Sequence, residues 1–112
     1  MTKTITSTIP EFPGTITLSS PLNLSQGYHI AVALETASAA DDSRAHKSFA
    51  TNSAILEALV ACSEGWDITG QPQKPTVETF VASPARPANQ LLSWAFGELT
   101  DLYFGERKVP NE

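Results

Sequence analysis

The chain has 112 residues, a formal net charge of −5, 41% hydrophobic residues and only 17% charged residues. This length suits one domain, and the composition allows a buried core. The single cysteine excludes an internal disulfide framework, and the lack of a basic cluster disfavours nucleic acid or an anionic membrane surface as a partner. With neither a membrane-spanning apolar run nor a secretion signal in view, we expect a cytoplasmic protein.

The N-terminal part is rich in threonine. Residues 1–13 contain two prolines and are expected to form an extended or flexible arm. In residues 14–20, Ile16 and Leu18 alternate with Thr and Ser, which predicts a short strand. Residues 4–6 are a candidate partner strand. Because a two-stranded hairpin alone is marginally stable in water, it would have to pack on helices or pair with another chain.

Two helices are predicted next. Apolar residues at helical spacing indicate a first helix over about residues 24–39, capped by Asn23 or Ser25. A second helix is expected over about 44–63 because its apolar residues form one stripe. Gly65 stands where a glycine typically follows a helix end.

The C-terminal half contains a loop and two further helices. Turn residues predict a loop over 66–75, and Thr76 is placed to cap a short helix over 77–82. The clearest helix runs from about 88 to 104, with Gly105 as its stop.

These elements predict a mostly helical α+β fold, with three main helices, one short helix and a small N-terminal β element. Residues 14–105 are expected to form one globular domain, followed by a flexible tail over 106–112. The predicted core unites apolar residues of the second and last helices, namely Leu56, Leu59, Val60, Leu92, Phe96 and Leu99.

Candidate nucleophiles and metal ligands are few. A nucleophilic site could be formed by Cys62, His29 and Asp67 if the fold brought them together. A cysteine in an apolar helix is, however, more simply a small buried hydrophobic residue. The pair at 41–42, Asp-Asp, offers two carboxylates to a metal, yet it lacks the calcium-loop spacing, and a capping and solvation role explains it more simply.

A second acidic group lies on the last predicted helix. Glu98, Asp101 and Glu106 would suit general acid–base chemistry, but their spacing fits a solvated helix edge better. No phosphate-binding glycine motif occurs. We therefore expect no catalytic residues, no cofactor and no metal.

The aromatic residues give the candidate partner-binding set. All of them fit the core of a small bundle, since aromatic rings bury large areas. Alternatively, Leu91, Trp94 and Phe104 of the last helix remain partly exposed and bind a partner helix. Trp66 is expected to pack back onto the last helix and anchor the following loop, or else to be an exposed contact.

Residues 55–103 combine several of these features. An apolar helix leads into Trp66-Asp67-Ile68-Thr69-Gly70-Gln71-Pro72, then a Pro75-Thr76 helix start, a Ser83-Pro84 break and a final amphipathic helix. This pattern resembles the small tail assembly chaperones, and related tail accessory proteins, of long-tailed bacteriophages. The opening at residues 12–22 is also similar to some of these proteins.

The resemblance implies a non-enzymatic role. Proteins of that family coat the long, apolar, helical tape-measure protein and keep it soluble while the tail tube polymerises around it. Self-association would favour repeated binding along such a client. Two alternatives remain open, namely a small phage interaction module or inhibitor that binds a host protein, and a small enzyme or ligand-binding domain.

Overall fold

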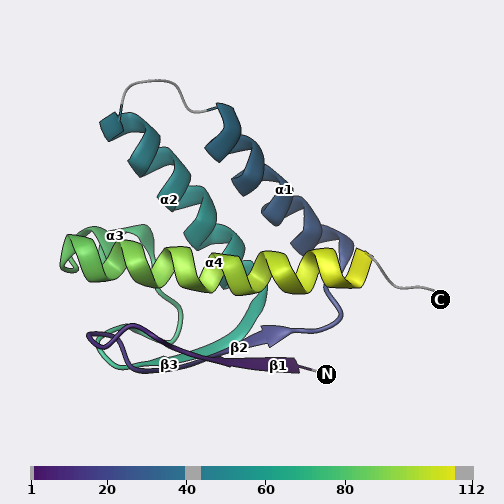
Figure 1. Cartoon of the computed structure of the whole chain (residues 1–112), viewed down its shortest axis with the longest axis horizontal. Coiled ribbons are helices and arrows are strands. Elements are labelled where there is room, and N and C mark those ends of the chain that lie inside the picture. The colour runs from purple at the N-terminus through teal and green to yellow at the C-terminus, as the bar shows by residue number, and fades with distance from the viewer. Residues whose placement is uncertain (1, 40–43, 108–112) are drawn as a thin grey trace.

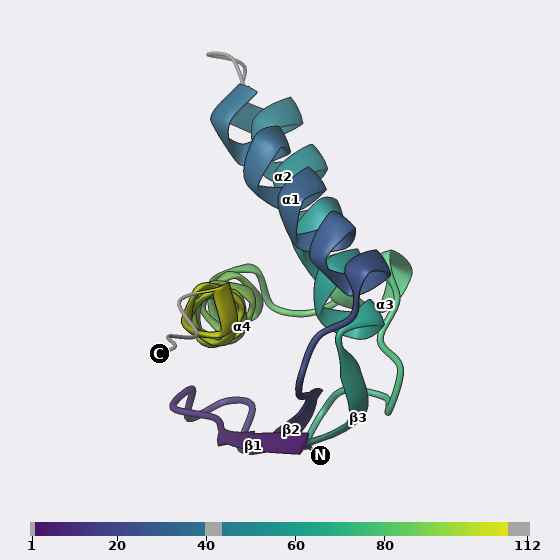
Figure 2. The same ribbon diagram turned by 90° about the vertical axis from the view of Figure 1, so that its right-hand side faces the viewer.

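The computed structural model describes residues 2–39 and 44–107, giving the backbone alone for 37–39, 44–50 and 106–107. This part of the chain has a mostly helical α+β fold, as the sequence predicts. Its elements are, in chain order, β1 (Thr2–Thr6), β2 (Gly14–Ser19), α1 (Leu24–Ala39), α2 (Arg44–Ala61), β3 (Ser63–Ile68), α3 (Val77–Val81) and α4 (Ala85–Arg107). Figure 1 shows α4 lying across one face of the sheet, and in Figure 2 the α1–α2 pair projects away from it.

The sheet is antiparallel, with strand order β1-β2-β3. Its central strand is the one that the alternation of Ile16 and Leu18 predicts, and both side chains are fully buried. The expected partner strand also forms, because Ile5 of β1 stands opposite Ile16. In the segment expected to be an arm, Ile5, Ile9 and Phe12 lie in the core.

The third strand corrects the sequence prediction. The sequence predicts that residues 63–68 end a helix and begin a loop at Trp66. In the structure they pair with β2, and Trp66 stands opposite Ile16. The physical reason is a period of two in which Trp66 and Ile68 are buried and Asp67 is exposed. Gly65 therefore lies inside a strand and does not end a helix.

The helix ends differ in detail from the prediction. The second helix ends at Ala61, two residues early, because the chain turns into β3. The last helix begins at Ala85 and continues through Gly105 to Arg107. A glycine inside a helix costs only about 1 kcal/mol, so Gly105 does not terminate a helix whose apolar face is packed.

The helix starts follow the predicted cap chemistry. The α1 bounds are those expected, and Asn23 is the cap: its Oδ1 accepts from the Gln26 backbone N–H at 2.8 Å, while the Asn23 N–H donates to Gln26 Oε1 at 2.8 Å. Thr76 caps α3 in the same reciprocal manner with Thr79. The proposed cap at residues 41–43 lies outside the described residues.

The core joins the sheet to α2 and α4. Of the six residues predicted to form it, Leu56, Leu59, Leu92 and Leu99 are buried. The other two, Val60 and Phe96, are partly buried against the same cluster.

Gly14 is required at the start of β2. Its φ is +136°, a conformation that L side chains rarely adopt, and a Cβ there would overlap the backbone carbonyl of Asp67. We expect Gly14→Ala to lower the free energy of unfolding by about 1–3 kcal/mol in urea titration. Gly65→Ala is the matched control, since nothing lies within 4 Å of its Cβ position. Equal stabilities of the two variants would contradict the requirement for glycine at position 14.

Candidate protein-binding surface

The four predicted partner-binding residues fall into two groups. Trp66 and Leu91 are buried, with 3% and 0% of their surface exposed. Trp94 is partly buried against the core, and Phe104 is 40% exposed. Phe104 is therefore the member of this set that offers a large apolar surface to a partner.

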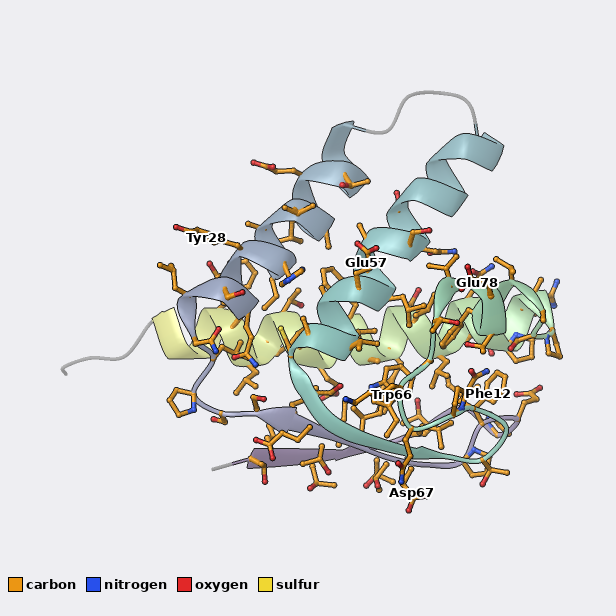
Figure 3. All side chains as sticks on the ribbon, turned by 180° about the vertical axis from the view of Figure 1, so that it is seen from behind. Phe12, Tyr28, Glu57, Trp66, Asp67 and Glu78 are labelled. Carbon is orange, nitrogen blue, oxygen red and sulfur yellow. The ribbon has the colours of Figure 1, made fainter. Side chains whose placement is uncertain are left out.

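Trp66 is held from two sides. Figure 3 shows it on the helix-facing side of β3, with Asp67 pointing the other way. Its indole Nε1–H donates to Ser63 Oγ at 3.0 Å, and its ring meets Phe80 of α3 edge-on, with centroids 6.1 Å apart. The acceptor of the indole N–H is therefore a side-chain hydroxyl three residues earlier in the same strand.

Three of the five large apolar side chains that are exposed in the described structure lie on α1. Leu24, Tyr28 and Val32 are 70%, 62% and 54% exposed. Their spacing of four residues places them in one row along the helix. Figure 3 shows Tyr28 on the side of α1 that faces away from α2. Among the residues that the structure describes, no element covers this row, and we call it the α1 stripe.

A groove borders the α1 stripe where the end of α4 meets the start of α1. Its volume is about 500 Å³, and it is lined by Leu22, Asn23, Leu24, Gly27, Tyr28, Ala31 and Tyr103. The absence of a side chain at Gly27 lets the Tyr103 ring come within 3.4 Å of the Cβ position. The Tyr103 and Phe104 ring centroids are 5.3 Å apart, so the exposed Phe104 ring lies beside a residue that lines the groove.

A second, smaller groove lies between α2, α3 and α4. It has a volume of about 330 Å³, and Leu56, Phe80 and Leu92 contribute to its lining. Asn52 Nδ2 donates to Asn89 Oδ1 at 2.9 Å across it. Both grooves are apolar with a few amide or hydroxyl groups, a composition typical of surfaces that bind side chains or small apolar molecules.

The sequence-based reading missed the α1 stripe for a specific reason. Tyr28, Ala31 and Val32 stand at helical spacing, which predicts a helix but does not say which of its sides is buried. In the structure, Ile30 and Ala33 face the core instead. The helix therefore carries apolar residues on two sides, one buried in the core and one exposed.

The polar candidates are not assembled into a reactive site. Burial raises the pKa of the Cys62 thiol to about 12, and its Sγ–H donates to the Gln26 carbonyl at 3.6 Å. The thiol is therefore protonated at neutral pH, as expected for a buried hydrophobic residue, whereas His29 and Asp67 are exposed. Among the residues that the structure describes, no three His, Cys, Asp or Glu side chains are grouped for a metal ion.

The remaining acidic candidates are described only in part. Glu98 is partly buried and Asp101 is exposed on α4, while the side chain of Glu106 and the pair at 41–42 lie outside the described residues. Within the described ranges, no helix is both long enough and apolar enough to cross a membrane.

Comparisons of the chain with protein-family models, curated proteins and solved structures find no match.

Proposed function

We propose that this protein is a non-enzymatic tail assembly chaperone of a long-tailed bacteriophage, which binds the tape-measure protein in the host cytoplasm during tail assembly. The observation that carries the proposal is the exposed α1 stripe, whose Leu24 and Tyr28 also line the groove beside Tyr103. The resemblance of residues 55–103 to such chaperones supports it independently.

The physical basis is burial of apolar surface. A helical client presents apolar residues every three to four positions, and these meet the row of Leu24, Tyr28 and Val32 as one helix packs on another. Full burial of one large apolar side chain contributes about 1.5–3 kcal/mol. A few such contacts per copy give a moderate affinity, and repeated copies along a long client raise the overall affinity without any covalent step.

Co-expression with a tape-measure protein tests the proposal. We expect the soluble fraction of that client to rise several-fold when this protein is present, and the two proteins to co-purify. Because salt screens charge contacts and does not weaken apolar burial, the complex should survive high salt. A client that is equally soluble without this protein, and that fails to co-purify at low and high salt, would contradict the proposal.

The interaction-module alternative gives a different result in the same experiment. A tight one-to-one complex with a single host protein, formed in the absence of any tail protein, would favour it. Its contacts would involve the acidic surface of the chain, so that complex should weaken as salt rises.

A further inference from the structure

The groove between α2, α3 and α4 plays no part in the proposed function. Four of its lining residues, Leu56, Phe80, Ala88 and Leu92, are buried side chains that are each less than a tenth exposed. Its volume of about 330 Å³ lies at the lower end of the roughly 300–1,000 Å³ that is typical of small-molecule sites. The groove therefore has the size and the apolar lining of a site for a compact ligand.

The α3 side of this groove is held in place by contacts to the rest of the molecule. The Phe80 ring meets Trp66 edge-on, with centroids 6.1 Å apart. Ser83 Oγ accepts from Gln71 Nε2 at 2.9 Å and donates to the Thr79 carbonyl at 2.9 Å. A ligand therefore meets a largely preformed site, and little binding energy is lost in ordering its walls.

The polar groups of the groove are neutral. Among the described residues that line it, none is charged, and the amide or hydroxyl side chains are those of Asn52, Ser53, Ser83 and Asn89. A charged ligand would lose hydration there without gaining an opposite charge. The lining therefore favours an uncharged ligand.

The two asparagines fix the polar part of that ligand. Asn52 Nδ2 donates to Asn89 Oδ1 at 2.9 Å, which joins α2 to α4. Within the described part of the chain, Asn52 Oδ1 and Asn89 Nδ2 have no hydrogen-bond partner, so the pair keeps one acceptor and one donor. A carboxamide offers the complementary donor and acceptor on neighbouring atoms. A small molecule can use them without breaking the bond that joins the two walls.

We propose that this groove binds a small uncharged carboxamide with a compact apolar body. The apolar body contacts Leu56, Phe80 and Leu92. The ligand carbonyl accepts from Asn89 Nδ2, and the ligand N–H donates to Asn52 Oδ1. None of these residues belongs to the α1 stripe, so this proposal does not rest on the proposed function, and each can fail without the other.

NMR titration of the isotope-labelled full chain with three matched probes tests the proposal. The probes are cinnamamide, its anionic analogue cinnamate and its cationic analogue cinnamylamine. Cinnamamide should shift the side-chain amide signals of Asn52 and Asn89 and bind with a dissociation constant on the order of 1 mM, as its size allows. Each charged probe should bind at least about tenfold more weakly, because the groove offers it no opposite charge.

Asn89→Asp separates the amide contact from the shape of the groove. The new carboxylate still accepts from Asn52 Nδ2 but no longer donates. Cinnamamide should therefore bind at least about fivefold more weakly than to the parent, and cinnamylamine at least about fivefold more tightly. Gln90→Glu makes the same charge change at the next exposed position of α4, outside the groove, and should leave both constants within about twofold of the parent.

The outcomes separate clearly. Binding of cinnamamide at the groove, weak binding of both charged probes and the changed preference of Asn89→Asp would support the proposal. Cinnamamide that shifts no groove signal, cinnamate that binds as tightly, or an Asn89→Asp variant that behaves like Gln90→Glu would overturn it. A blocked pentapeptide with a central phenylalanine that binds at least about tenfold more tightly than cinnamamide would also overturn it, because the groove would then be a polypeptide site.

Discussion

Trp66→Ala is expected to lower the free energy of unfolding by about 3–5 kcal/mol, the range found when a large buried aromatic side chain is truncated. Trp66 is 3% exposed, and its ring is in edge-on contact with Phe80. It also stands opposite Ile16, so its loss opens a cavity between the sheet and α3. The hydroxyl of Ser63 loses its indole donor as well, although it still donates to the Val60 carbonyl at 3.3 Å.

Urea unfolding followed by circular dichroism measures this effect, and Trp66→Phe is the matched control. Phenylalanine keeps an aromatic ring against Phe80 and loses the indole N–H, so we expect a cost clearly smaller than that of alanine. An alanine variant within about 0.5 kcal/mol of the parent would show that Trp66 is a surface residue. That result would return Trp66 to the set of candidate client contacts.

Leu59→Ala and Leu99→Ala should each cost about 2–5 kcal/mol. Both side chains are fully buried, one on α2 and the other on α4, and both belong to the single core cluster. Removing three carbons from either leaves a cavity that the packed sheet and helices fill only in part. Val81→Ala, at a side chain that is 66% exposed on α3, is the control and should change stability by less than about 0.5 kcal/mol.

Thermal and urea unfolding of these three variants would test the packing of α2 on α4. If both leucine variants unfolded like Val81→Ala, the buried faces of the two helices would be wrongly assigned. If only one of them did, the error would be confined to the helix that carries it.

The parts of the fold that the sequence predicts are those set by local chemistry. The start of α1 follows from the reciprocal bond between Asn23 and Gln26, and the start of α3 follows from Thr76. The strand at Gly14–Ser19 follows from its alternation of apolar and hydroxyl residues. Each of these signals lies within a few residues of the element it controls.

The parts that the sequence does not reveal depend on distant contacts. β3 is short and contains Gly65, so its alternation is weak, and it becomes a strand because β2, more than forty residues earlier in the chain, supplies a pairing edge. The α1 stripe is missed for a related reason. Which of two apolar faces of α1 is buried depends on where α2 packs, and helical periodicity alone does not decide this.

The most direct measurement of the central claim is co-purification of the client with surface variants of this protein. Tyr28→Asp places a charge in the middle of the α1 stripe, whereas Val81→Asp places the same charge on an equally exposed apolar residue of α3. We expect Tyr28→Asp to reduce the client recovered at least about tenfold, and Val81→Asp to retain it. Both variants should keep the parent's unfolding profile, because neither side chain is buried. Full client recovery with Tyr28→Asp, or its loss with Val81→Asp alone, would contradict the assignment of the α1 stripe as the binding surface.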